Sequence, residues 1–235
     1  MPFFSTSLKF FLRIIRFVLL LLLKTFSRLF YPCKAQWSPE KIQSWPQVKL
    51  IIFLNHTSLF EVLFIQLASI KGLWTIAGRF IAPGADITFE RPIVGKILHT
   101  LIPGIIPISR KKDDTWQHFL SLVDHEKITA ILPEGRMKRR NGLDKNGQPM
   151  SVRSGFVDIL QKLNHGQILF VYSGGLHHIQ APGEKLPKLF KKIKANLEVV
   201  DLLKYKQQFN MTDATEFRAQ VMTDVGNKLR DNIPK

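Results

Sequence analysis

Short apolar runs rich in β-branched residues alternate with amphipathic segments over most of the chain. Such alternation is typical of a sheet whose two faces are covered by helices, because each element has an apolar side that must be buried. We expect strands at residues 48–54, 73–77, 104–108, 127–132, 167–172 and 197–202. We expect helices at residues 58–70, 92–99, 115–125, 153–164 and 213–231. The sequence therefore predicts an α/β fold with a central mixed sheet covered by helices.

Local signals refine this assignment. Asp113 and Asp213 each precede a predicted helix, where a short acidic side chain accepts hydrogen bonds from the first free N–H groups. The polar, glycine-containing segment 137–150 is expected to be a surface loop. Five lysines lie between residues 185 and 194, with Leu189 and Phe190 among them. They predict a basic helix that either faces solvent or contacts anionic lipid, coenzyme A phosphates or an acidic carrier protein.

The N-terminal segment, residues 8–30, is rich in Phe, Leu and Ile and carries cations but no acid. Its longest uncharged stretch, residues 17–23, is far shorter than the roughly 20 apolar residues that span a bilayer. On a helix, the five cations fall within an arc of roughly 120° and apolar side chains fill the rest. These cations are Lys9, Arg13, Arg16, Lys24 and Arg28.

A helix of this kind is typical of a membrane surface, with its apolar side in the bilayer and its cations on anionic head groups. Two alternatives are a helix docked on the protein's own core and a short span with snorkelling ends. Pro32 cannot continue the helix. We therefore predict a membrane-interface helix at residues 1–35 and a main domain at residues 36–235, with the boundary near Ala35.

The charge balance and the single cysteine restrict the classes of partner. The chain has 34 Lys and Arg against 18 Asp and Glu, a net charge of +16 that attracts nucleic acid, anionic lipid or phosphorylated substrates. We find no basic recognition helix and no aromatic RNA-binding signature, so we expect no nucleic-acid partner. Cys33 is the only cysteine, which excludes an internal disulfide and a thiol metal cluster. We expect no metal site.

Polar residues directly follow the predicted strand 48–54, at the sheet edge where α/β proteins bind ligands. The segment Asn55–Glu61 reads NHTSLFE and places an acid five residues after His56. Glu61 could accept the Nδ1 proton of His56 and leave Nε2 free to act as a base. Alternatively, His56 caps the next helix and Glu61 is solvated.

Three further segments follow in order: GIIPISR at residues 104–110, ILPEGR at 131–136 and RSGF at 153–156. Together with NHTSLFE they resemble the glycerophospholipid acyltransferase superfamily, and most closely the 1-acylglycerol-3-phosphate acyltransferases. The signatures of that family are N-H-x-x-x-x-D/E, G-x-I-P-I-x-R and F-P-E-G-T-R. Two departures are Glu61 in place of the commoner Asp and Arg136 one residue early. The resemblance covers residues 48–175 and makes residues 36–235 an acyltransferase domain.

The resemblance implies a reaction and roles for three residues. A fatty acyl group would pass from acyl-CoA or acyl carrier protein, as co-substrate, to the free hydroxyl of 1-acylglycerol-3-phosphate in phospholipid biosynthesis. His56 would act as the general base, and Glu61 would hold its tautomer. Arg110 would bind the acceptor phosphate, because a guanidinium matches phosphate oxygens. No cofactor is implied.

The turn of residues 133–136 would supply further substrate contacts. Arg136 would assist Arg110, and Glu134 would hydrogen-bond the glycerol or orient Arg110. Backbone N–H groups of this turn, which includes Gly135, or of the helix start near Ser58 would bind the oxyanion. Membrane lipids would be partners, with the protein peripheral or monotopic on the cytoplasmic face. The alternatives are a related enzyme with a lysolipid or lipid A type acceptor, and a catalytically inactive lipid-binding relative.

Overall fold

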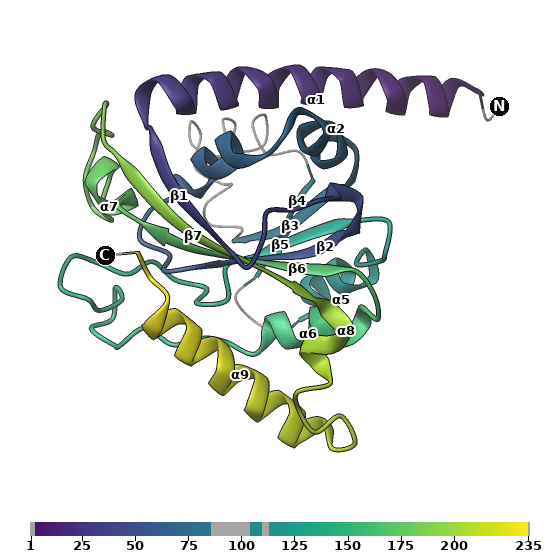
Figure 1. Cartoon of the computed structure of the whole chain (residues 1–235), viewed down its shortest axis with the longest axis vertical. Helices are drawn as coiled ribbons and strands as arrows, with labels where there is room; N and C mark the ends of the chain where they lie inside the picture. The colour runs from purple at the N-terminus through teal and green to yellow at the C-terminus, as the bar shows by residue number, and fades with distance from the viewer. Residues whose placement is uncertain (1–2, 86–103, 110–112, 235) are drawn as a thin grey trace.

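The computed structural model describes residues 3–85, 104–109 and 113–234. Within these residues seven strands form one sheet in the order β1-β7-β6-β2-β5-β3-β4 (Figure 1). The strands are β1 (Cys33–Ser38), β2 (Val48–Leu54), β3 (Phe80–Ala85), β4 (Ile105–Ile108), β5 (Ile128–Ile131), β6 (Gln167–Gly174) and β7 (Ile193–Asp201). Strands β6 and β7 pair antiparallel, and the other neighbours pair parallel. The predicted α/β fold with a mixed sheet is confirmed.

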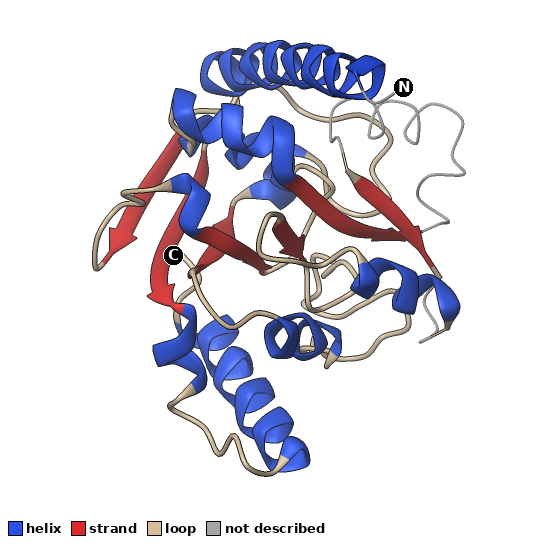
Figure 2. Ribbon diagram, turned by 90° about the vertical axis from the view of Figure 1, so that its right-hand side faces the viewer, coloured by secondary structure: helices blue, strands red, loops and turns tan. Residues whose placement is uncertain are grey.

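Helices cover both faces of the sheet (Figures 1 and 2). On one side lie α1 (Phe3–Phe30), η2 (Glu61–Leu67), α2 (Ile70–Arg79) and α7 (Leu176–Ile179), together with the short η1 (Trp45–Gln47). On the other side lie α5 (Asp114–Ser121), α6 (Gly155–Lys162), α8 (Leu202–Lys206) and α9 (Ala214–Asp231). Strand β2 is buried between two cores, because Leu50 and Ile52 pack with α5 and α6 whereas Ile51 packs with α1 and η2.

The strands predicted over 48–54, 104–108, 127–132, 167–172 and 197–202 are present as β2, β4, β5, β6 and β7. Helices α5, α6 and α9 match their predictions, and both caps are confirmed. Asp113 accepts a hydrogen bond from the N–H of Thr115, and Asp213 accepts bonds from two N–H groups at the start of α9. The predicted helix 92–99 lies outside the described residues.

Three predicted elements are wrong. Residues 73–77 belong to helix α2, because Ser69 caps its start by accepting a hydrogen bond from Gly72 and the apolar run is buried between α1 and the sheet. The predicted helix 58–70 is a shorter 3-10 helix, η2. The predicted basic helix is a loop, residues 185–192, followed by β7. Strands β1 and β3 were not predicted. Pro83 and Gly84 are residues that usually interrupt strands, and the alternating polar residues of β1 do not form an apolar run.

Helix α1 turns two of its cations, Arg13 and Lys24, toward the protein and part of its apolar side outward. Arg13 donates hydrogen bonds from Nε and Nη2 to the carbonyl oxygen of Trp74, at 3.2 and 2.9 Å. Lys24 is buried and donates from Nζ to the carbonyl oxygen of Gln66 at 2.7 Å and to that of Ala68. The expectation that these two cations bind head-group phosphates is therefore wrong, because backbone carbonyls occupy them.

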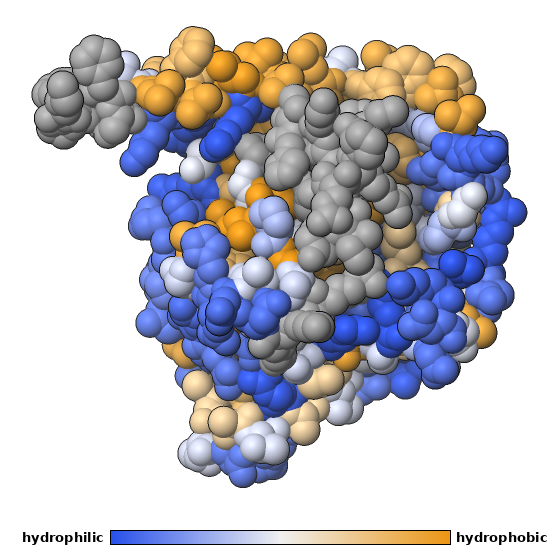
Figure 3. All heavy atoms as spheres, turned by 180° about the vertical axis from the view of Figure 1, so that it is seen from behind, coloured by the Kyte–Doolittle hydropathy of each residue, from blue (hydrophilic) through white to orange (hydrophobic). Residues whose placement is uncertain are grey.

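The outward side of α1 is an apolar band along the top of the molecule (Figure 3). Its exposed residues include Leu8, Phe10, Phe11, Ile15, Leu22, Phe26 and Leu29. Among the described residues, no helix has the length and apolarity that crossing a membrane requires. The predicted boundary near Ala35 falls inside β1, which pairs with β7 over its whole length. Helix α1 is thus joined directly to the edge of the sheet.

Candidate active site

The motifs meet at the carboxyl edge of parallel strands. Strand β2 ends at Leu54 and is followed by His56, and its parallel neighbour β5 ends at Ile131 and is followed by Glu134 and Gly135. The residues that follow neighbouring parallel strands lie at the same edge of the sheet. Segments 75 to 80 residues apart in sequence therefore lie together here.

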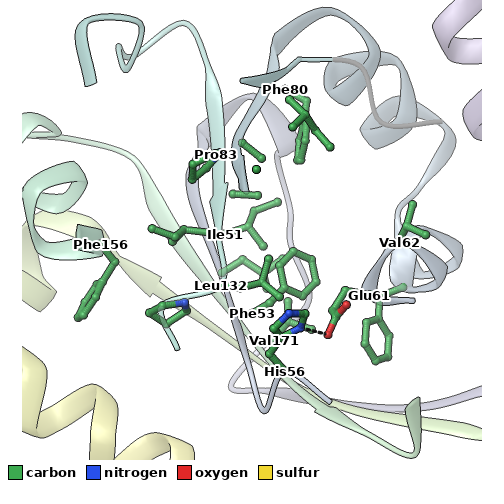
Figure 4. Close-up of a pocket in the computed structure, with 18 of the residues that line it drawn as sticks. Ile51, Phe53, His56, Glu61, Val62, Phe80, Pro83, Leu132, Phe156 and Val171 are labelled. Atoms are coloured by element: carbon green, nitrogen blue, oxygen red, sulfur yellow. Dashed lines mark hydrogen bonds and ion pairs between the residues drawn. The ribbon is translucent and has the colours of Figure 1, made fainter. Parts of the chain in front are cut away.

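His56 and Glu61 form a hydrogen-bonded pair (Figure 4). The Nδ1 atom of His56 lies 2.7 Å from Oε1 of Glu61, which is the first residue of η2. Their side chains are 13% and 10% exposed, so the pair is largely shielded from water yet still accessible. Within the described residues, His56 Nε2 makes no hydrogen bond. An Nδ1–H held by the carboxylate leaves Nε2 as the unprotonated nitrogen of the neutral ring.

Electrostatics favour the charged form of this imidazole. Burial alone would lower the pKa of His56, but the charge of Glu61, the hydrogen bond to it and the charge of Glu134 together raise the pKa above 6.5. The pair thus stabilises an imidazolium once His56 has accepted a proton. The same shift means that the neutral, basic form of His56 predominates only at pH values above this raised pKa.

Glu134 holds the histidine loop from behind. Its side chain is 1% exposed, and Oε1 accepts hydrogen bonds from the backbone N–H of Asn55 at 2.7 Å and of His56 at 3.1 Å. Burial raises the pKa of Glu134 in spite of these bonds. Asn55 has a positive φ of 69°, and its amide donates to the carbonyl oxygen of Ser173 at 2.8 Å. The prediction that Glu134 hydrogen-bonds the glycerol or orients Arg110 stays a prediction: among the described residues that line the cavity beside His56, Glu134 is absent, and Arg110 lies outside the described residues.

An apolar cavity of about 570 Å³ begins at His56 and Glu61 and runs over the α1 side of the sheet (Figure 4). Its wall includes Leu20 of α1, Trp37 of β1, Phe53 of β2, Val171 of β6 and Leu197 of β7. Pockets for small molecules commonly measure about 300–1,000 Å³ and combine apolar walls with a few polar groups. The arrangement therefore suits a ligand with a long apolar part and a reactive polar end.

The two motif arginines that the structure describes, Arg136 and Arg153, lie in different places. Arg136 points into its own loop, where it forms an ion pair with buried Asp144 and donates to Ser151 Oγ at 3.2 Å. It does not line the cavity that the described residues enclose, so the structure does not bring it to His56. Arg110 lies outside the described residues, whereas Ser109 before it lines the cavity.

Arg153 is the arginine or lysine that lines the cavity among the described residues, and the sequence predicted no role for it. It follows the β5 loop, and its N–H donates to the carbonyl oxygen of Pro133 at 2.8 Å. A Cβ on Gly135, whose φ is 63°, would lie 3.2 Å from Arg153 Cδ. Gly135 therefore lets the arginine approach the rim. The sequence signal that could have identified Arg153 was the position of the RSGF segment, directly after the loop and at a helix start.

The groups near the two predicted oxyanion sites differ in whether they already make a hydrogen bond. The N–H of Gly135 already donates to the carbonyl oxygen of Leu132 at 3.1 Å, so it is not free for an oxyanion. The hydroxyls of Thr57 and Ser58 are buried and have no hydrogen-bond partner among the described residues. The described part of the chain contains no group of three or more His, Cys, Asp or Glu side chains placed to hold a metal ion.

Comparisons with known proteins agree with this architecture. The family model described as "Acyltransferase" matches residues 38–173, more than half of the chain. The crystal structure of the 1-acyl-sn-glycerophosphate (LPA) acyltransferase PlsC from Thermotoga maritima is similar, with a TM-score of 0.54 and 17% sequence identity over 99% of this chain and 91% of that one. At this identity the likeness shows the shared fold. No curated protein matches the chain. The chain belongs to the acyltransferase family.

Proposed function

We propose that the protein transfers a fatty acyl group from acyl-CoA or acyl carrier protein to the free hydroxyl of 1-acylglycerol-3-phosphate, with His56 as the general base. One observation carries the proposal: an imidazole oriented by a carboxylate at 2.7 Å stands at the rim of an apolar cavity. The similar protein from Thermotoga maritima is a 1-acyl-sn-glycerophosphate acyltransferase, which supports this choice of acceptor.

The reaction needs no covalent enzyme intermediate. His56 Nε2 removes the proton of the acceptor hydroxyl as its oxygen attacks the thioester carbonyl, and Glu61 stabilises the imidazolium that results. When the tetrahedral intermediate collapses, the C–S bond breaks and the imidazolium returns the proton to the departing thiolate. A positioned base of this kind contributes roughly 10²–10⁴ to the rate.

The cavity and its rim divide the substrate between them. An acyl chain fits the apolar wall that reaches Leu20 in α1 and Leu197 in β7. The acceptor phosphate binds Arg153 at the rim, together with Arg110, whose neighbour Ser109 lines the same cavity. A guanidinium suits this role because it keeps its charge and matches two phosphate oxygens.

The outward side of α1 supports a location on a membrane surface. Phe10, Phe11, Leu22 and Leu29 are between 58% and 68% exposed along one helix. Side chains of this size in contact with a bilayer would bury the apolar band that the protein itself leaves uncovered. We propose that the protein is peripheral or monotopic on the cytoplasmic face, with membrane lipids as partners.

A radiolabelled transfer assay tests the proposal. Purified protein is given labelled acyl-CoA or acyl carrier protein and a panel of acceptors: 1-acylglycerol-3-phosphate, lysolipids without its phosphate monoester, and lipid A precursors. We expect labelled diacylglycerol phosphate, and its loss in His56→Ala with an unchanged melting temperature. Product from a lipid A precursor alone would identify the related enzyme, and no product from any acceptor would identify an inactive lipid-binding relative.

A further inference from the structure

A loop beside the C-terminal end of α1 combines cations with exposed apolar side chains. The lysine loop, residues 185–192, connects the region after α7 to β7. Its side chains Leu186, Leu189 and Phe190 are 78%, 48% and 69% exposed. Its four lysines, Lys185, Lys188, Lys191 and Lys192, are all exposed. Large apolar side chains grouped in this way on a surface mark a contact with a partner.

Backbone hydrogen bonds hold the lysine loop at its middle and just after its last residue. The N–H of Lys188 donates to the carbonyl oxygen of Ile179 at 2.8 Å, and the N–H of Ile193 donates to that of Pro32 at 3.1 Å. Between them Phe190 has a φ of 58°, a left-handed conformation that a bulky residue rarely adopts. A strained backbone that presents an aromatic ring to solvent indicates a role beyond folding.

The exposed apolar residues of the loop continue the band on α1. The ring of Phe190 lies 5.4 Å from the ring of Phe30, which lies 4.7 Å from that of Phe26, an exposed residue of the band. In Figure 1 the green segment between α7 and β7 rises beside the end of α1. The two elements therefore present one surface, although 155 or more residues separate them in sequence.

We propose that the lysine loop is a second membrane contact, in which Leu186, Leu189 and Phe190 enter the interface and the lysines bind anionic head groups. The proposal rests on the membrane location of α1 proposed above. The cations of α1 cannot all serve this purpose, because Arg13 and Lys24 bind backbone carbonyls. The loop adds exposed cations to this surface: Lys185, Lys191 and Lys192, together with Lys188, whose Nζ also lies 3.1 Å from Oε1 of Glu184, the only acid between residues 176 and 194. A bilayer fits better than an acidic protein because the apolar surface is continuous with α1.

Flotation of the full chain with vesicles of phosphatidylcholine, with or without phosphatidylglycerol, tests the proposal. The first variant replaces all four lysines, Lys185→Gln, Lys188→Gln, Lys191→Gln and Lys192→Gln. Each lysine near an anionic surface contributes about five-fold in binding, so we expect a loss of about 100-fold or more on phosphatidylglycerol vesicles. Binding to neutral vesicles stays unchanged, and the salt dependence becomes weaker.

A second variant separates membrane contact from folding. Phe190→Gly removes the ring but suits a φ of 58°, so we expect weaker binding to both kinds of vesicle without a lower melting temperature. The matched control is Leu203→Ser with Lys204→Gln, because both residues are exposed on α8, away from α1 (Figure 1). This control should bind vesicles like the parent.

Three results would overturn the proposal. Unchanged vesicle binding in both loop variants would remove the contact, and a clearly lower melting temperature of Phe190→Gly would make the ring structural. A higher KM for acyl carrier protein with unchanged vesicle binding would identify a protein partner instead. The acyltransferase proposal is tested separately, because the loop variants should retain transfer to a detergent-dispersed acceptor and His56→Ala should retain vesicle binding.

Discussion

Lys24 of α1 donates a hydrogen bond from Nζ to the carbonyl oxygen of Gln66, near the end of the same short helix that begins with Glu61. Helix η2 is therefore held at one end by His56 and at the other by the N-terminal helix. Burial, with a smaller contribution from the charge of Arg28, lowers the pKa of Lys24 to about 8. A buried lysine is retained here because it satisfies two carbonyl groups.

Replacing this lysine should loosen the η2 helix. In Lys24→Met the carbonyl oxygens of Gln66 and Ala68 lose their donor, so we expect the free energy of unfolding to fall by about 1–3 kcal/mol. We also expect a lower kcat, because Glu61 is less well held. Chemical denaturation and steady-state kinetics measure both effects. Lys9→Met, at an exposed position of the same helix, should change neither, and equal losses in the two variants would contradict the role of Lys24.

The Glu61→Gln variant should change the pH profile as well as the rate. The amide removes the charge that raises the pKa of His56, while the burial that lowers it remains. The acid limb of kcat/KM should therefore move to lower pH, and its plateau should fall about 10²–10⁴-fold. Glu61→Asp keeps the charge and should hold the acid limb near that of the parent. A limb that stays in place in Glu61→Gln would show that another group limits the rate.

We expect Arg153 to recognise the acceptor by binding the phosphate of the acceptor. In Arg153→Ala we expect the KM for 1-acylglycerol-3-phosphate to rise about ten-fold or more, with little change for a lysolipid that lacks the phosphate monoester. Arg110→Ala should behave in the same way if both arginines bind that phosphate. Arg136→Ala serves as the comparison, because Arg136 binds Asp144 in its own loop. Equal effects of Arg153→Ala on both acceptors would exclude phosphate recognition.

Glu134 should prove necessary for the shape of the loop and not for contact with substrate. In Glu134→Ala the N–H groups of Asn55 and His56 lose their acceptor, so we expect a loss of about 1–3 kcal/mol in stability together with most activity. Glu134→Gln keeps an oxygen at this place and should retain more of both. A variant Glu134→Ala of normal melting temperature with only a higher acceptor KM would indicate a direct substrate contact instead.

The sequence predicted the strands with uninterrupted apolar runs better than β1 and β3, in which polar residues, Pro or Gly intervene. Strand β2 contains the continuous apolar run of residues 50–54 because both of its faces are buried, and that pattern can be read without knowing which strands are its neighbours. Helix α2 and strand β3 depend on what packs beside them, since a short, mostly apolar run fits either structure. The spacing in NHTSLFE indicated that Glu61 can reach His56, which it does.

The directions of the remaining side chains required the tertiary structure. The P-E-G segment says nothing of where Glu134 points, because the N–H groups that donate to it lie just after the neighbouring strand β2, 78 or 79 residues away in sequence. An amphipathic pattern predicts that α1 has a charged side and an apolar side, but it does not indicate which side faces the protein. The carbonyl groups of Trp74 and Gln66 decide this, since they bind the cations that sequence alone assigns to phosphates.

Leu20 lies in α1 and also lines the cavity that begins at His56. A shortened form that starts after residue 30 would therefore lose more than its apolar band, because the pocket would be left without part of its roof. Such a form would be a poor guide to chain-length preference, and water could enter from the open side.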